Sequence, residues 1–179
     1  MPKSRYHSAY MKKTTIVLAA DHAGFALKEA TKSFLSSSFY AEKYDILDVG
    51  AHELVDGDDY PVFMSAAAMH VAADAKAVTK AIIFGKSGQG EAMVANRFPG
   101  VRAVVWYGAA AGVAGASDAA GSDDIIKLSR EHNNANVLSI GAGFVTEAQA
   151  LKAIELWLAT PFSDDPRHER RIMEIDSIE

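Results

Sequence analysis

Residues 82–97, IIFGKSGQGEAMVANR, combine a glycine-rich loop with a carboxylate. An apolar run ends at Gly85, the loop continues to Gly90, and a helical pattern begins near Glu91. Backbone N–H groups in such a loop can converge on a negative charge, and the amino end of a helix adds to the attraction. A base beside oxyanion donors is what an enediolate reaction requires. A glutamate in a first helical turn also stabilises the helix itself, so the residues alone leave both roles open for Glu91.

The letters Gly-Lys-Ser raise the alternative of a nucleotide-binding loop. A P-loop follows G-x-x-x-x-G-K-[ST], which would require a glycine at Lys80, inside an apolar strand pattern. The dinucleotide pattern G-x-G-x-x-G fails too, because Met93 follows Gly88 and Gly90 where the third glycine is needed. The loop is therefore not predicted to bind a nucleotide.

Two further polar pairs lie next to apolar runs. Asp21 and His22 directly follow the run 14–20, where Asp21 suits a helix cap and both residues suit a ligand site. His132 and Asn133 come just before the last apolar run, and a histidine can exchange protons near neutral pH. For both pairs a structural role and a functional role remain open.

The tail SDDPRHERR, residues 163–171, concentrates positive charge in an acidic chain. Asp165 and Pro166 are typical of the cap and the first residue of a helix. Arg167 and Arg171 are then four residues apart on one helix face. This face is either a solvated basic surface or a pair of guanidinium groups that can hold a phosphate dianion.

Composition excludes several classes of partner. The chain has 179 residues, a net charge of −5 and no cysteine. The acidic balance argues against nucleic acid or an anionic membrane as a partner, and no apolar run approaches the roughly 20 residues of a membrane span. The lack of cysteine excludes disulfides and a thiolate nucleophile and fits a cytoplasmic protein. The histidines form no pair four residues apart and LVDGDDY lacks calcium-loop spacing, so no metal site is expected.

The chain alternates short apolar runs with helical patterns. Strands are expected at 14–20, 44–50, 80–85, 101–107 and 136–142, and helices at 25–37, 61–75, 91–97, 125–133, 146–160 and after Pro166. Five continuous apolar strands separated by helices predict an α/β fold with a doubly wound, Rossmann-like parallel sheet covered on both faces. In such folds ligands bind at the carboxyl ends of the strands.

Domain organisation follows from the same pattern. Residues 1–10 are expected to be a flexible extension and 11–179 a single domain. Residues 107–124, rich in Gly, Ala and Ser, have little periodicity and are interpreted as a surface insertion.

Several of these stretches together resemble one family, the ribose-5-phosphate isomerase B / galactose-6-phosphate isomerase group of sugar-phosphate isomerases. The matching stretches are ADHAGFALK (20–28), DVGAHELVDGDDYP (48–61), GKSGQGEAMVANR (85–97), GVRAVVW (100–106), LSREHNNANVLSIGA (128–142) and PRHERR (166–171). The resemblance implies a homodimer with active sites shared between subunits, with the C-terminal helix reaching the partner. It leaves open whether dimers pair further. It also implies a sugar phosphate as substrate, with no metal and no organic cofactor.

Catalytic roles are implied by the same resemblance. One branch of the family carries a cysteine at the position of Gly85 and another carries a glutamate at the position of Glu91. This chain is similar to the glutamate branch, so Glu91 is expected to move the proton between C1 and C2. His132, with Asp21 nearby, is expected to open the furanose ring.

Binding roles follow in the same way. The enediolate oxygens are expected to contact Ser87 and the backbone of Lys86, Gly88, Gln89 and Gly90. Asn133 is expected to contact the sugar. The phosphate is expected to be held by His22, Arg167 and Arg171, partly across the dimer interface.

Three positions depart from the family pattern. Lys86 stands where the glutamate branch usually has glycine, Gly143 stands where the family has an arginine, and 107–124 is longer than the usual link. They leave three hypotheses: an isomerase of ribose 5-phosphate and ribulose 5-phosphate, an isomerase of a phosphorylated hexose or tetrose, and a sugar-phosphate-binding protein without activity.

Overall fold

The structure is a computed structural model that describes residues 13–74, 77–108 and 122–178. Five parallel strands form one sheet in the order β2-β1-β3-β5-β4. They are β1 (Thr14–Ala20), β2 (Tyr44–Asp48), β3 (Lys80–Gly85), β4 (Ala103–Trp106) and β5 (Val137–Gly141). The predicted α/β fold with a five-stranded parallel sheet is confirmed.

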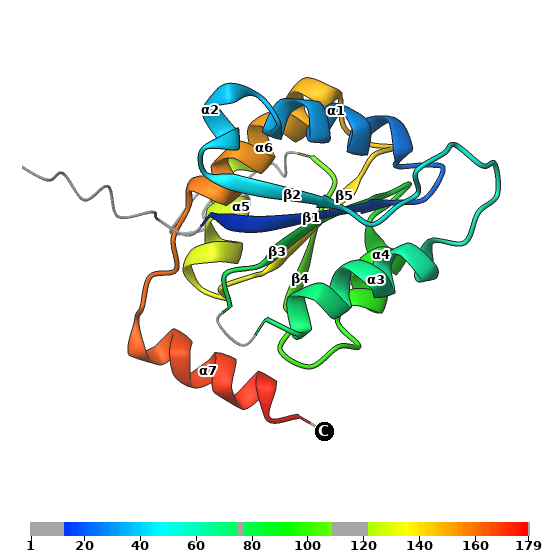
Figure 1. Ribbon diagram of the computed structural model, residues 1–179. Coiled ribbons are helices and arrows are strands. Elements are labelled where there is room, and N and C mark those ends of the chain that lie inside the picture. Colours follow the sequence, from blue (N-terminus) through cyan, green and yellow to red (C-terminus); the bar gives the residue numbers. More distant parts are fainter. Residues whose placement is uncertain (1–12, 75–76, 109–121, 179) are drawn as a thin grey trace, which may run out of the picture.

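Helices cover both faces of the sheet (Figure 1). They are α1 (Phe25–Leu35), α2 (Ser38–Ala41), α3 (Tyr60–Ala72), α4 (Gln89–Ala95), α5 (Ser122–Glu131), α6 (Glu147–Ala159) and α7 (Pro166–Asp176). Helices α1, α5 and α6 pack on the face that carries Leu18 and Ile82, and α3 and α4 pack on the face that carries Val17 and Ile83. Because successive strand residues point to opposite faces, the central strands are apolar along their whole length.

Several predicted boundaries were wrong by a few residues. Helix α3 ends at Ala72 and not at residue 75, and α5 begins at Ser122, so the end of the predicted insertion 107–124 belongs to a helix. Helix α4 begins at Gln89 and not near Glu91, because Gly88 adopts a left-handed conformation (φ 77°) and turns the chain into the helix early. The predicted extension 1–10 and residues 109–121 of the insertion lie outside the described residues.

The order of the strands places a crevice between β1 and β3. The chain leaves β1 toward β2 on one side of the sheet, whereas β3 and β5 lie on the other side. Ligands of open parallel sheets bind at such a switch point, outside the carboxyl ends of the strands. Asp21 and Gly85 both follow the aligned pair Ala20 and Phe84, so the fold brings their loops together.

Helix α7 lies apart from the layers that cover the sheet (Figure 1). It is joined to the amino ends of the strands, because Arg102, just before β4, forms an ion pair of 3.2 Å with Asp176 near the end of α7. The two predicted arginines of the tail are therefore carried on the side of the molecule where the strands begin.

Candidate active site

Glu91 lies in a space that only a glycine at position 85 leaves free. The residue is 5% exposed, and within the described residues its Oε2 has no hydrogen-bond partner. A Cβ atom on Gly85 would lie 1.5 Å from Oε1 of Glu91. The carboxylate thus fills the position that a side chain at the end of β3 would occupy.

The surroundings of Glu91 favour a base that titrates closer to neutrality than an exposed glutamate. Burial raises the pKa of Glu91, and the charge of Asp21 raises it further. The backbone N–H groups of Glu91 and Gly88 act in the opposite direction, but the net shift of the pKa is upward. A raised pKa brings a carboxylate nearer to the range in which general bases work well.

The glycine-rich loop is fastened to the end of β5. The N–H groups of Ala142 and Gly143 donate to the carbonyl oxygens of Gly85 (2.8 Å) and Lys86 (2.9 Å). The hydroxyl of Ser139 donates to the carbonyl oxygen of Gly88 at 2.7 Å. These bonds fix the loop in front of Glu91 before any ligand arrives.

The predicted loop residues Ser87, Gln89 and Gly90 lie between Gly85 and Glu91 in the chain. Ser87 is half-buried, and its hydroxyl accepts the N–H of Gln89 at 3.3 Å. A Cβ atom on Gly90 would lie 2.7 Å from the phenol oxygen of Tyr60, so Tyr60 packs directly on the loop. Sequence reasoning did not single out Tyr60.

The turn after β1 lies against the end of β3. A Cβ atom on Gly24 would lie 2.5 Å from the backbone of Phe84, so the close approach requires glycine. Asp21 is 6% exposed, and its Oδ1 accepts the N–H groups of Ala23 (3.0 Å) and Gly24 (3.1 Å). The expectation that Asp21 caps the helix was wrong: the N-cap of α1 is Gly24, which has no side-chain hydrogen bond, and Asp21 instead closes the turn before it.

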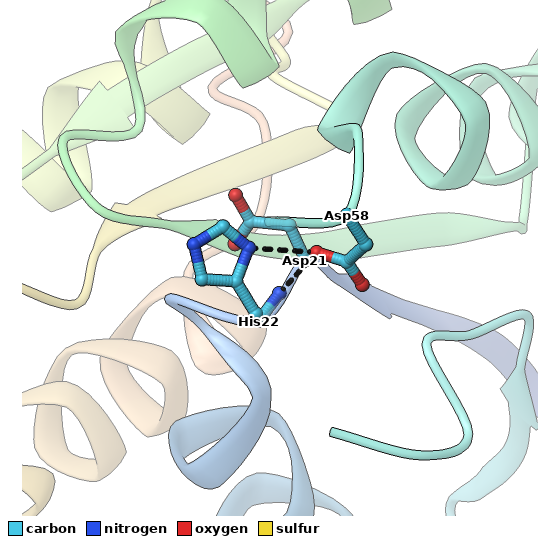
Figure 2. Close-up of side chains that lie close together, drawn as sticks. All are labelled: Asp21, His22 and Asp58. Atoms are coloured by element: carbon cyan, nitrogen blue, oxygen red, sulfur yellow. Dashed lines mark hydrogen bonds and ion pairs between the residues drawn. The ribbon is translucent and has the colours of Figure 1, made fainter. Parts of the chain in front are cut away.

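His22 is held by a residue that sequence reasoning missed (Figure 2). Oδ1 of Asp58 accepts the backbone N–H of His22 at 2.7 Å and lies 2.7 Å from Nδ1 of its ring. The hydrogen bond to Asp58 is the main cause that raises the pKa of His22, and the charge of Asp21 adds to it. The imidazole therefore keeps its positive charge to higher pH, as an anion-binding residue requires.

Asp21, His22 and Asp58 also bring three possible metal-ligand atoms close together. Their ligand atoms lie within 4.8 Å of one another. Spacing along the chain does not indicate this group, because Asp58 is 36 positions from His22. The ring of His22 and one oxygen of Asp58 already bond to each other, so a cation would have to replace that bond.

His132 and Asn133 lie on the other side of the sheet, near the amino end of β5. They follow α5 and precede β5, where a guanidinium group of Arg102 donates to the carbonyl oxygens of Asn133 (3.0 Å) and Asn134 (3.2 Å). The buried Arg130 donates to Oδ1 of Asn134 at 3.0 Å. Two arginines therefore fix the loop that presents His132 and Asn133.

The predicted basic face on α7 is present and exposed. Asp165 caps the helix as predicted, and its Oδ1 accepts the N–H of Arg167 at 2.9 Å. Nε of Arg167 lies 3.2 Å from Oδ2 of Asp165, and Arg171 is exposed one turn further along the helix. That backbone bond from Arg167 is the main cause that lowers the pKa of Asp165.

One copy of the chain does not bring all predicted residues together. Asp21, His22, Ser87 and Glu91 follow strands, whereas His132 and Asn133 precede one, so the length of β5 separates the two groups. Five residues of strand span about 16 Å. The resemblance implied that Asp21 lies near His132. Within one chain they are far apart, so the two groups can meet only between two copies.

The two departures at Lys86 and Gly143 are neighbours in space. A Cβ atom on Gly143 would lie 3.0 Å from the carbonyl oxygen and 3.2 Å from Cγ of Lys86. Both residues are exposed. The stem of Lys86 thus lies over the position where the family pattern has an arginine side chain.

Among the described residues, no helix combines the length and the apolar character needed to cross a bilayer.

Comparison with known proteins gives a consistent result. The model of the Ribose/Galactose Isomerase family matches residues 16–175. Ribose-5-phosphate isomerase B from Mycolicibacterium paratuberculosis is 37% identical over 158 residues, which cover 88% of this chain and 86% of that protein. The protein of the same name from Escherichia coli is 31% identical over 172 residues, covering 94% and 97%.

Solved structures agree with this likeness. Ribose-5-phosphate isomerase B from Mycoplasma genitalium with bound ribulose-5-phosphate superposes with a TM-score of 0.74 at 28% identity, covering 90% of this chain and 93% of that one. The type B ribose 5-phosphate isomerase from Trypanosoma brucei gives a TM-score of 0.77 at 27% identity, covering 94% and 100%.

Proposed function

The chain belongs to the Ribose/Galactose Isomerase family and is an aldose–ketose isomerase, and we propose that it interconverts D-ribose 5-phosphate and D-ribulose 5-phosphate. The observation that carries the proposal is the buried carboxylate of Glu91 beside a glycine-rich loop whose carbonyl oxygens are fastened to the end of β5. A general base next to oxyanion donors is the equipment that proton transfer through an enediolate needs, without a metal or an organic cofactor.

The reaction begins with opening of the furanose ring. His132 and Asp21 exchange the protons of this step: one protonates the ring oxygen while the other accepts the proton of the C1 hydroxyl, leaving an aldehyde at C1. Within one chain Asp21 lies at the carboxyl ends of the strands and His132 at their amino ends. Asp21 of one copy therefore works with His132 of a second copy. Asn133 contacts the sugar from the same side as His132.

Proton transfer between C2 and C1 follows. Glu91 removes the proton from C2, and the electron pair moves toward the carbonyl oxygen to give the enediolate. Ser87 and the backbone N–H groups of Lys86 to Gly90 stabilise the negative charge on oxygen. Glu91, now protonated, returns the proton to C1, and a proton shift between the two oxygens completes the ketose.

The phosphate supplies binding energy away from the reacting carbons. His22 is suited to hold it, because the hydrogen bond that His22 donates to Asp58 raises the pKa of His22. Arg167 and Arg171 approach it from the second copy, since α7 lies on the side of the molecule that carries His132. The proposed enzyme is a homodimer with active sites shared between its two subunits, and it is located in the cytoplasm.

The first experiment measures ketose formation from D-ribose 5-phosphate in EDTA. Wild type should turn over, and Glu91→Gln should lose turnover while it still binds the sugar phosphate. Glu147→Gln is the matched control, because Glu147 is also a first-turn glutamate but is exposed on α6. Undiminished turnover in Glu91→Gln would exclude Glu91 as the base.

A second assay separates the two chemical steps. D-Ribulose 5-phosphate has no free 5-hydroxyl to close a furanose ring, so exchange of its C1 proton with D₂O reports enediolate formation alone. Glu91→Gln should abolish this exchange, whereas His132→Asn should keep it and lose only turnover of ribose 5-phosphate. Loss of exchange in both variants would contradict the division of roles.

Shared sites can be tested by mixing two inactive variants. If Glu91 and His132 come from different copies, a mixed dimer of Glu91→Gln and His132→Asn contains one intact site and one doubly altered site. After random subunit exchange about a quarter of the wild-type activity should return. No recovery after proven exchange would place both residues in one subunit.

A phosphorylated hexose or tetrose remains the alternative substrate, because Lys86 and Gly143 change the polar surface beside the loop. A panel of aldose phosphates, compared by kcat/KM, decides between the two. Binding of ribose 5-phosphate without turnover of any member would favour the non-catalytic alternative.

A further inference from the structure

His168 is unlike the rest of the helix that carries it. It is 4% exposed and is the only buried residue of α7, all of which the structure describes. The arginines on either side of it, Arg167 and Arg171, are exposed. A polar ring buried on an otherwise exposed helix needs a partner, and its neighbours show which one.

The ring of His168 packs on the ring of His132. Their centroids are 4.2 Å apart and the planes are inclined by 47°. The contact joins two segments far apart in the sequence, the loop after α5 and the first turn of the tail helix. It also places His168 beside the residue to which ring opening is assigned.

A serine fixes the orientation of His168. Nδ1 of His168 lies 3.2 Å from Oγ of Ser163, and the same hydroxyl donates to the carbonyl oxygen of Glu131 at 2.6 Å. The N–H of Ser163 donates to that carbonyl as well, at 3.2 Å. Glu131 directly precedes His132, so the bonds tie the ring of His168 to the backbone that presents His132.

Counting protons defines the state of His168. The hydroxyl of Ser163 has one hydrogen, which the short bond to Glu131 uses. The hydroxyl must then accept from Nδ1–H of His168, and in the neutral ring the lone pair lies on Nε2. His168 therefore has a defined tautomer and a defined ring plane.

The described residues around the ring of His132, apart from His168, are mostly apolar. His132 lines a cavity of about 270 Å³ whose other walls are largely apolar, formed by residues that include Val104, Trp106, Ile126 and Leu138. A ring at the edge of such a cavity can rotate unless a neighbour restricts it. Within the ranges 13–74, 77–108 and 122–178, the contact with His168 is the ring contact that restricts His132.

We propose that His168 is a positioning residue, which holds the imidazole of His132 in the orientation needed to open the sugar ring. The role of His132 in ring opening rests on the proposed function, whereas the contact between His168 and His132 does not. His168 does not touch the substrate; it acts through His132, and Ser163 acts through His168.

Two substitutions separate the ring contact from the hydrogen bond. His168→Asn keeps a donor for Ser163 and removes the ring, whereas His168→Phe keeps a ring against His132 and removes the donor. His70→Asn is the matched control, because His70 is exposed on α3. Thermal unfolding of each variant shows whether the fold is retained.

Turnover and exchange are then compared. His168→Asn should lower kcat for ribose 5-phosphate by about 10- to 100-fold, since a misplaced catalytic group costs about that much. The KM and the exchange of the C1 proton of ribulose 5-phosphate should stay unchanged, because they do not need ring opening. His168→Phe should restore part of the loss. Unchanged turnover in His168→Asn, or equal loss of turnover and exchange, would overturn the proposal.

An NMR measurement needs no substrate. The ring of His168 shifts the carbon-bound ring protons of His132 through its ring current, so their resonances should move in His168→Asn and stay in place in His70→Asn. Unmoved His132 resonances would overturn the inference even if wild type is fully active. Silent wild type with shifted resonances would instead reject the proposed substrate and leave the positioning contact supported.

Discussion

Substituting alanine for Gly85 tests the geometry of the proposed base most directly. The added Cβ would lie 1.5 Å from Oε1, 2.3 Å from Cδ and 2.8 Å from Cγ of Glu91. Contacts of a Cβ below 3.0 Å essentially do not occur, so Oε1 must move by about 1.5 Å or more. Gly85 does not have a positive φ, so alanine itself fits the backbone there.

The size of the effect follows from this displacement. A shift of about 1 Å in a reacting group can cost about 100-fold in rate. Gly85→Ala should therefore lower kcat by at least about 100-fold, which corresponds to about 2.7 kcal/mol of activation free energy. Forcing one extra methyl group into a packed site also costs about 1–3 kcal/mol of stability.

A double-mutant cycle identifies the clash as the cause. Glu91→Ala removes the carboxylate that the new methyl group would meet. In that background Gly85→Ala should be neutral or raise the free energy of unfolding in urea by up to about 1 kcal/mol, because alanine restricts the unfolded chain. In the wild-type background the same substitution should be destabilising.

Two results would refute the reasoning. Near wild-type turnover in Gly85→Ala would mean that the carboxylate does not act from the position it occupies here. Equal destabilisation in both backgrounds would mean that the methyl group meets something other than Glu91. Either result can be read from one set of four purified proteins.

Three further predictions follow from the contacts around the sites. Asp58→Asn removes the main cause that raises the pKa of His22. At pH values above neutral this variant should have a higher KM for ribose 5-phosphate than wild type, whereas near pH 5.5, where His22 is protonated in both proteins, the two KM values should be similar. The same ratio of variant to wild-type KM at both pH values would contradict this. Burial alone would raise the pKa of Asp48, but hydrogen bonds from Lys28 and Lys32 lower it to about 2. Because the pKa of Asp48 is lower in the folded protein, its contribution to stability is complete above the unfolded pKa near 4 and is lost as pH falls toward 2. The free energy of unfolding in urea should therefore drop by about 2 kcal/mol over that window in wild type, and by less in Asp48→Asn. Gly143→Arg alone should weaken activity, because its Cβ meets the carbonyl oxygen of Lys86 at 3.0 Å and Cγ of Lys86 at 3.2 Å. Lys86→Gly removes only the side-chain contact, so the double variant should regain part of the activity; additive losses in kcat/KM would show that the two side chains do not interact.

The sequence was sufficient to predict the helices and strands and part of the site. Continuous apolar runs predicted the parallel strands, and Asp165 before Pro166 predicted the start of α7. The glycine-rich loop was recognised because its glycines interrupt a strand and a helix. Local patterns of this kind depend on neighbours in the chain, which the sequence displays.

Contacts between distant segments were not predictable. Asp58 bonds to His22 across 36 positions, and no pattern near either residue signals the bond. Tyr60 packs on Gly90, and His168 packs on His132, for the same reason. The strand order, which decides that the loops after β1 and β3 meet, is likewise absent from the periodicity.

One mismatch could have been foreseen. The amino ends of parallel strands lie at one edge of the sheet and the carboxyl ends at the other. His132 precedes β5 while Asp21 follows β1, so their positions relative to the strands already exclude a close approach within one chain. The sequence therefore contained an argument for a site shared between copies that does not depend on resemblance.

The geometry at Gly85 also gives a reason why the two branches of the family are alternatives. A cysteine at position 85 would place its Cβ in the space that the carboxylate of Glu91 fills. One base can occupy this space, from the end of the strand or from the first turn of the helix, but not both. A chain that changes from one base to the other must alter both positions. In the same way, the lysine at 86 and the glycine at 143 are in contact and have to be understood as one change in the surface beside the loop.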